Sequence, residues 1–190
     1  MDNWIKAGKI ASEAREYGRS LVVVGANLLE VTEKVEAKII ELGGKIAFPA
    51  QLSRNSTAAH YNAIVDDKTV FLEGDLVKLD VGAHVEGAIG DTACTIDLGD
   101  NSNLVKASED ALKAAIETAK PGVEVREIGK AINKVITDAG LSPIKNLGGH
   151  GLGEYQIHTS PSIPIFDNGD KTVLKEGDTI AIEPFATDGS

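Results

Sequence analysis

Apolar residues recur with a helical period in four stretches of the chain. Their spacing of three and four residues predicts amphipathic helices with one buried face each. Glycines stand where these patterns stop, at Gly43-Gly44 and at Gly140, as expected for helix ends. The predicted helices are residues 2–19, 25–42, 102–119 and 124–139.

Between the second and third helices the pattern changes to alternation with a period of two. Residues 45–52 predict a strand, with Pro49 at an edge or a bulge. Residues 76–81 and 88–96 flank a turn candidate, His84-Val85-Glu86-Gly87, and together predict a β-hairpin. Residues 142–190 indicate short strands and loops.

The predicted hairpin places two acidic residues close together. A turn centred between Val85 and Glu86 places Asp80 directly opposite Asp91, with Cβ atoms roughly 4.5–5.5 Å apart. Like charges at that distance need a cation, a shared proton or a wet surface between them. Divalent metal ions are the common solution, since they take carboxylate oxygens directly. The alternative is a solvated strand pair with ordinary surface acids.

Two halves of the chain repeat each other. The glycines that bracket the second helix and those that bracket the fourth are both 18 residues apart, and the two pairs are offset by 97. Residues 73–80, EGDLVKLD, match residues 176–183, EGDTIAIE, at an offset of 103. Asp80 therefore corresponds to Glu183. Two helix-then-strand units that each deliver a carboxylate suggest a pseudo-two-fold arrangement with one site between the halves.

Charge, hydropathy and cysteine content argue against several classes of protein, namely nucleic-acid-binding, membrane and secreted proteins. The net charge of −10 argues against nucleic acid or an anionic membrane as a main partner. The polar start has no signal-peptide core, and no apolar run approaches the length of a membrane span. The single cysteine, Cys94, fits a reducing, cytoplasmic compartment and is expected to be a buried spectator rather than a nucleophile.

Four histidines could add to the carboxylates. His150 lies in the glycine-rich stretch NLGGHGLGEY, where close backbone approach leaves the imidazole reachable as a ligand, although such a residue is often only part of a loop. His60 and His158 could orient a substrate or stabilise developing charge. His84 is expected to be solvated at the turn.

Four motifs carry a family resemblance: AFPAQLSRNSTAAHY, LDVGAHVEGAIGDTA, GGHGLGEYQIH and AIEPFAT. The chain closely resembles methionine aminopeptidases, above all the archaeal form of the type 2 branch. The resemblance implies the α+β pita-bread fold, a curved antiparallel sheet covered by two pairs of helices. It implies one metallopeptidase domain over residues 1–190, with half-repeats at about 20–98 and 101–190.

The same resemblance implies a centre of two divalent metal ions, Co, Mn, Fe or Zn, that activate a water molecule. Asp80 would chelate one ion and Asp91 would bridge both. His150 and Glu183 would complete the coordination of the other ion. Glu183 would also take a proton from the water.

Substrate contacts are implied in the same way. His60 would bind the substrate or the tetrahedral intermediate, and His158 would contact the scissile peptide from the other side. Phe48, Pro49 and Ile163 would line an apolar pocket for the methionine side chain.

The implied activity is removal of the initiator methionine from nascent polypeptides, close to the ribosome. One alternative is a proline-directed aminopeptidase of the same fold, although FPAQLS, IEPFAT and the lack of a large N-terminal domain argue against it. The other is a non-catalytic relative that acts as a binding module. Binding modules of this fold typically lose the metal ligands, whereas this sequence retains four candidate ligands, Asp80, Asp91, His150 and Glu183.

The resemblance also implies a fifth ligand, a second bridging glutamate on a later strand, which the repeat places near position 194. We therefore expect this sequence to be a fragment that lacks a helical insertion and the last strand, or one piece of a split protein that needs a C-terminal segment or second chain. An unpaired sheet edge beside Ile180 to Phe185 and weak or no peptidase activity are the corresponding expectations.

Overall fold

The computed structural model describes residues 1–189 and divides into two compact units, Met1–Asn101 and a second from Ser102 onward. The four predicted helices are present, and every end lies within three residues of its predicted position. Their bounds are α1 Asp2–Leu21, α2 Leu28–Glu41, α3 Ser102–Thr118 and α4 Val125–Asp138.

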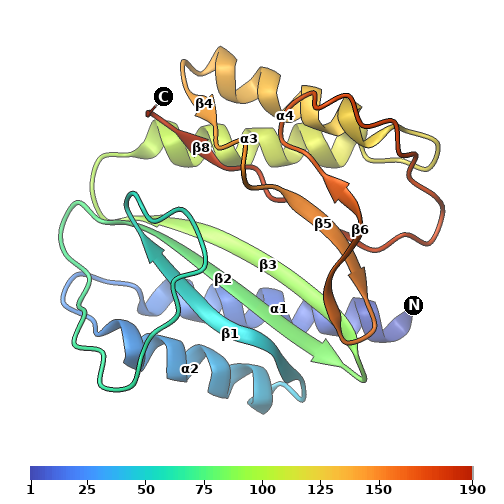
Figure 1. Cartoon of the computed structure of the whole chain (residues 1–190). Helices are drawn as coiled ribbons and strands as arrows, with labels where there is room; N and C mark the ends of the chain where they lie inside the picture. The colour runs from blue at the N-terminus through green and yellow to red at the C-terminus, as the bar shows by residue number, and fades with distance from the viewer. Residues whose placement is uncertain (190) are drawn as a thin grey trace. The chain divides into compact units, whose positions relative to one another are not determined.

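In the first unit α1 and α2 cover one face of a three-stranded antiparallel sheet (Figure 1). The strand order is β1-β2-β3, and the strands are β1 Lys45–Arg54, β2 Leu76–Val85 and β3 Ala88–Asp97. α1 lies close to the sheet because its buried face carries only small residues, Ala7, Ala11, Ala14 and Gly18. A Cβ on Gly90 of β3 would come within 2.5 Å of the Ala7 backbone.

The hairpin is confirmed, but its predicted register is wrong. Val85 pairs with Ala88, so the turn consists of Glu86 and Gly87, both with positive φ (48° and 90°). That is the type I′ geometry whose twist matches the flanking strands. The turn centre moves by one residue and every pairing moves by two, so that Asp80 faces Ala93 and Asp91 faces Gly82.

β1 carries the irregularity predicted at Pro49. Phe48 pairs with Gly82 and Gln51 with Asp80, so three steps along β1 match two steps along β2. The extra residue is a bulge, and Pro49 lies inside it, where no ladder hydrogen bond is required of its nitrogen. The bulge brings Phe48 and Gln51 to the same face of the sheet.

The second unit combines α3 and α4 with two small antiparallel sheets, ordered β6-β5-β7 and β4-β8. Its core consists of apolar residues from α3, α4 and the segment after β6. β7 lies at the edge of its sheet, as predicted, but it is short and residues 182–185 continue outside any strand. The strands are β4 Ser142–Pro143, β5 Gly149–Gly153, β6 Gln156–Ile163, β7 Ile180–Ala181 and β8 Ala186–Thr187.

The internal repeat is visible in matching hydrogen bonds of the two units. In the first unit the Gly25 nitrogen donates to the Phe71 oxygen, and in the second Gly122 donates to Leu174, both at 2.8 Å. The glycines at corresponding positions share the left-handed conformation, as in Gly25 and Gly122, with φ of 87° and 91°. The common sequence pattern thus encodes a common local fold.

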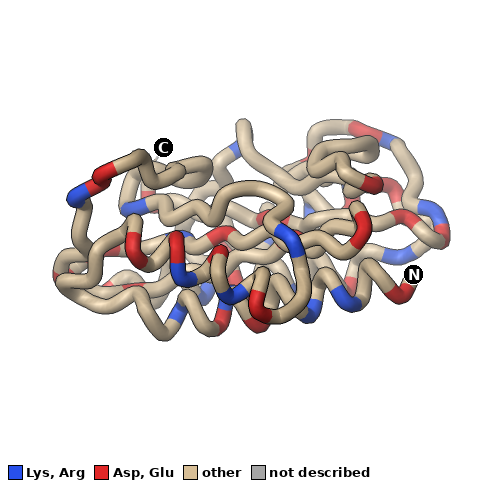
Figure 2. Tube along the Cα trace, turned by 90° about the horizontal axis from the view of Figure 1, so that it is seen from below, with Lys and Arg blue, Asp and Glu red and all other residues tan. Residues whose placement is uncertain are grey.

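Charged residues of both signs are interspersed along the chain, as Figure 2 shows for the described trace. The net charge of −10 is therefore spread over the surface rather than carried by one acidic segment. Among the described helices, none combines the length and the apolar composition that crossing a bilayer requires.

Candidate functional site

Asp80 and Asp91 lie on the same face of the first unit's sheet, opposite the helices. The predicted shared face is confirmed, because Asp80 is paired with Ala93 and Asp91 is two residues from Ala93 on β3. The direct pairing of the two is wrong, and they are instead diagonal neighbours, which still lie within about 7–8 Å of each other. Both residues are half-buried, and Asp80 Oδ1 is inaccessible to solvent.

Phe48 lies in the same cross-strand row as Gly82 and Asp91. Its ring covers Gly82 so closely that a Cβ there would overlap it. An aromatic ring thus adjoins the two aspartates on one face, while Pro49 in the bulge is exposed. A wall of the predicted methionine pocket would need an apolar side chain beside the metal ligands, and Phe48 lies beside Asp91.

His60 lies in the loop after β1, in the same unit as the aspartates. It is exposed and adopts a left-handed backbone conformation, φ 66°. Its backbone nitrogen donates to Gln51 Oε1 at 3.1 Å. The loop is therefore held to β1 by a side chain.

Of two other residues singled out in the first unit, His84 takes a different place from the one expected, whereas Cys94 is placed as a spectator. His84 is not at the turn but within β2, half-buried and paired with Ile89, and its Nδ1 accepts from the Gly87 nitrogen at 3.3 Å. Cys94 is partly buried and packs against the core. Burial raises the pKa of its thiol to about 11, so that it stays protonated near neutral pH.

In the second unit His150 and Glu183 meet directly. Nε2 of His150 lies 3.0 Å from Oε1 of Glu183. Nδ1 of His150 lies 3.1 Å from the Gly151 carbonyl oxygen, which can only accept. With the proton on Nδ1, the Nε2 lone pair is directed to the carboxylate side.

The glycines around His150 are explained by close strand approach. A Cβ on Gly149 would overlap the Ala181 carbonyl, and one on Gly151 would overlap the Ser160 carbonyl. Only hydrogen atoms fit between β5 and its two neighbours at these positions. The GGHG motif thus lets three backbones converge around one imidazole.

This donor arrangement fits a divalent cation. A lone pair and a carboxylate 3.0 Å apart repel each other unless a proton or a cation lies between them. Two ligand atoms that bind the same ion, each at about 2.0–2.2 Å, can lie about 3 Å from each other. A backbone carbonyl on the second imidazole nitrogen is also the usual support of a metal-ligating histidine. Asp91, His150 and Glu183 each offer one potential ligand atom.

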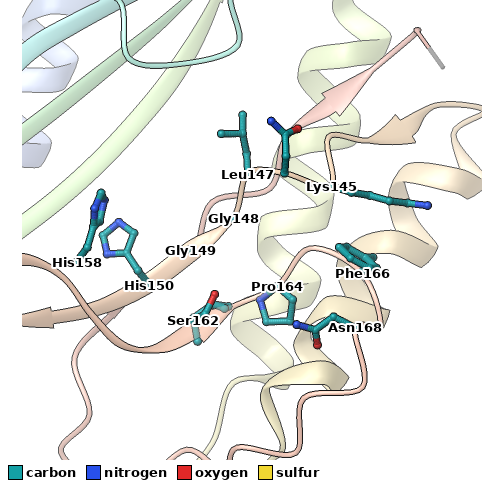
Figure 3. Close-up of a pocket in the computed structure, with 12 residues that line it drawn as sticks. Lys145, Leu147, Gly148, Gly149, His150, His158, Ser162, Pro164, Phe166 and Asn168 are labelled. Carbon is teal, nitrogen blue, oxygen red and sulfur yellow. The ribbon is translucent and has the colours of Figure 1, made fainter.

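His158 is exposed on β6, and its ring stands edge-on to that of His150 at 4.1 Å between centroids. Both histidines border a cavity of about 410 Å³ (Figure 3). Ile163 is fully buried and contributes to the cavity wall. At the other end Lys145 lies over the Phe166 ring, 5.6 Å from its centroid.

Within each unit the structure therefore brings the predicted residues together in part: Asp80, Asp91 and Phe48 in the first, His150, Glu183 and His158 in the second. Sequence reasoning missed Gln51. Simple alternation puts Gln51 and Phe48 on opposite faces, and only the bulge at Pro49 reverses this.

A model of metallopeptidase family M24 matches residues 2–189. The chain belongs to this family. Membership of a metallopeptidase family implies that the chain binds divalent metal.

Two curated relatives with about half of their residues identical to this chain come from archaea. A methionine aminopeptidase of Pyrococcus horikoshii is 50% identical over all of this chain and 65% of its own length. One of Archaeoglobus fulgidus is 52% identical over 97% of this chain and 64% of its own length. The chain thus spans a little under two thirds of the relatives that it matches.

Solved structures agree on the fold. A methionine aminopeptidase of Thermotoga maritima is 31% identical with a TM-score of 0.92, covering 99% of this chain and 80% of that one. The prolidase of Pyrococcus furiosus is 30% identical with a TM-score of 0.85, covering 96% of this chain and 55% of that one. The M24 chain therefore has the predicted pita-bread fold.

Proposed function

We propose that the M24 chain carries the metal-binding and substrate-binding residues of a methionine aminopeptidase, which removes the initiator methionine from nascent polypeptides. The observation that carries the proposal is the 3.0 Å approach of His150 Nε2 to Glu183 Oε1, with Nδ1 of the same ring beside a carbonyl. The names of the archaeal relatives, at about half identity, favour this substrate.

Four residues would hold the metal. His150 and Glu183 supply one nitrogen and one carboxylate, and Asp80 and Asp91 supply carboxylates from the other half of one domain. Two divalent ions, Co, Mn, Fe or Zn, are proposed for this set. Such ions acidify water toward neutral pH and polarise a peptide carbonyl.

The remaining steps belong to the chain's own side chains. Glu183 accepts a proton from the attacking water and returns one to the leaving amine. His60 and His158 donate hydrogen bonds to the oxygen that becomes negative as the peptide carbon turns tetrahedral. The ring centroids of His158 and His150 are 4.1 Å apart. A peptide carbonyl bound beside the metal that His150 would hold is therefore within reach of His158.

The methionine side chain needs an apolar surface beside these groups. Phe48 and Pro49 on β1 and Ile163 in the cavity wall are proposed to provide it. Ile163 and its apolar neighbours Pro164 and Phe166 line the cavity that His150 and His158 border. A thioether chain fits such an irregular apolar lining because it is flexible and polarisable.

The activity test is hydrolysis of Met-Ala-Ser by the purified chain with Co²⁺ or Mn²⁺, compared with an Xaa-Pro peptide. The proposal expects methionine to be released from Met-Ala-Ser, if only weakly as the sequence predicts, and this release to be lost in Glu183→Ala, because the proton acceptor and a ligand disappear together. Cleavage of only the Xaa-Pro peptide would establish the proline-directed alternative. Absence of bound metal by elemental analysis would favour a binding module instead.

Nascent chains as substrate place the enzyme in the cytoplasm, near the ribosome. We propose that the chain contacts the nascent polypeptide itself, with no direct nucleic-acid or membrane contact. Co-sedimentation with ribosomes in low salt, abolished by removing nascent chains with puromycin, would test the substrate link.

A further inference from the structure

His60 adopts an unfavourable backbone conformation, and the Gln51 side chain binds its backbone nitrogen. Its φ of 66° lies in the left-handed region, which residues with a Cβ adopt rarely, and the residue is exposed. Such a conformation persists only where the surroundings fix it. The shorter of two side-chain contacts to the His60 backbone is the hydrogen bond from its nitrogen to Gln51 Oε1, 3.1 Å long.

The neighbouring contacts mainly hold other residues of the loop, and only one weaker contact reaches the His60 oxygen. The Tyr61 nitrogen donates to Ser53 Oγ, and the Leu52 nitrogen donates to the Tyr61 oxygen, both at 3.1 Å. A longer contact, 3.4 Å, joins the Asn62 side chain to the His60 oxygen. Gln51 and Ser53 therefore support adjacent residues of the same loop, which makes them a matched pair.

Gln51 also stands beside the candidate metal ligands. It is the register partner of Asp80 on the face opposite the helices, because the bulge at Pro49 turns it to that side. It is half-buried, and its side chain spans from this face to the His60 backbone. One residue thus connects the strand that carries Asp80 with the loop that carries His60.

We propose that Gln51 is a positioning residue that fixes the His60 backbone in its left-handed conformation, and so sets where the imidazole is presented. The Gln51 backbone pairs with Asn62, and its side-chain oxygen adds the acceptor for the His60 nitrogen. The effect of Gln51 on turnover rests on the proposed function, in which His60 stabilises the transition state. Its effect on the His60 backbone does not.

The backbone effect is tested by NMR measurement of amide–water exchange in the whole chain. Gln51→Met keeps the length but removes the acceptor, and should speed exchange at the His60 amide roughly two- to tenfold, in line with loss of one hydrogen bond. Gln51→Glu retains the acceptor oxygen and should stay near the parent rate. Ser53→Ala should speed exchange at Tyr61 rather than at His60. Unchanged exchange at His60 in Gln51→Met would overturn the inference.

The catalytic effect is tested on the same variants with Met-Ala-Ser. Gln51→Met should lower kcat roughly two- to tenfold with KM within about twofold, because a group that acts on the transition state is misplaced. Ser53→Ala should keep kcat within about twofold. Equal losses of kcat in the two variants would show general loosening of the loop and refute the positioning role. A parent chain that binds neither Mn²⁺ nor Co²⁺ would refute the proposed function, and His60 exchange would still decide the role of Gln51.

Discussion

Gly82 leaves room for the Phe48 ring beside Asp91, because a hydrogen atom stands where any other residue has a Cβ. At such a position the neighbouring group that packs against the strand, rather than the strand conformation, requires glycine. The same holds at Gly149 and Gly151, where neighbouring carbonyls take the space on both sides of His150. Three glycines therefore shape the surroundings of the candidate ligands.

Gly82→Ala should destabilise the protein by about 1–3 kcal/mol, since the added methyl must displace the Phe48 ring. It should also raise KM for Met-Ala-Ser if Phe48 lines the methionine pocket. Urea unfolding and steady-state kinetics measure the two effects. The control is Gly8→Ala in α1, where nothing lies within 4 Å of the added Cβ, and which should stabilise by about 0.5–1 kcal/mol. A Gly82→Ala variant as stable as the parent would contradict the crowding argument.

At the scale of elements, the EGD sequence occurs in two turns, residues 73–75 and 176–178, which have the same local hydrogen bond but differ in burial. Asp75 accepts from the Leu72 nitrogen at 2.9 Å, and Asp178 accepts from the Lys175 nitrogen at 2.8 Å. Asp75 is 5% exposed and is also bound by Arg54 and Asn55. Asp178 is exposed. Burial acts to raise the pKa of Asp75, but these hydrogen bonds and the guanidinium charge outweigh it, so the pKa is lowered.

Asp75→Asn should cost roughly 1.5–3 kcal/mol, as expected for hydrogen bonds to a charged group, whereas Asp178→Asn should cost about 0.5–1.5 kcal/mol or less. Because the native pKa of Asp75 lies below its ordinary value of 3.8, the unfolded chain binds the proton first. The stabilisation is thus complete well above pH 3.8 and is lost as the pH falls through the native pKa. Unfolding curves from pH 7 to 2.5 should show the difference between parent and Asp75→Asn shrinking at the acid end. A difference that stays constant with pH would contradict the assignment.

The β2–β3 turn offers a second test at this scale. Glu86 adopts a left-handed conformation, φ 48°, at a position that favours asparagine. Glu86→Asn should stabilise the chain by up to about 1 kcal/mol, the cost of that conformation for an ordinary residue. Glu154→Asn is the control, because Glu154 lies in the β5–β6 turn next to Tyr155 but is not among the residues with positive φ. Thermal unfolding that responds equally to both substitutions would refute this explanation.

For the whole molecule, the question is whether residues of the two units serve one metal centre. Asp91→Ala in the first unit and His150→Ala in the second should then abolish the same Mn²⁺ or Co²⁺ binding event, measured by calorimetry and elemental analysis. Asp91→Ala should lower occupancy more than Asp80→Ala, since the proposed bridging ligand serves both ions. Asp66→Ala, at an exposed loop position, is the control and should bind like the parent.

Metal should also raise stability by mass action, by about 2.7 kcal/mol at a free concentration of 100 Kd. The stabilisation should vanish in both Asp91→Ala and His150→Ala. Two separable binding events, each sensitive to substitutions in only one unit, would contradict a shared centre.

The sequence by itself determined the helices, the strands of the first unit and the repeat, because apolar periodicity and glycine positions are local signals that short-range physics obeys. It also indicated Asp80, Asp91, His150 and Glu183, since ligand chemistry depends on residue type. Register and side-chain reach were decided only by the tertiary structure. A type I′ turn one residue further along moved Asp80 away from Asp91, and a bulge at Pro49 brought Gln51 to the face that carries them. The turn position and the bulge both depend on how whole strands twist and pack against each other, and a local sequence pattern does not determine this.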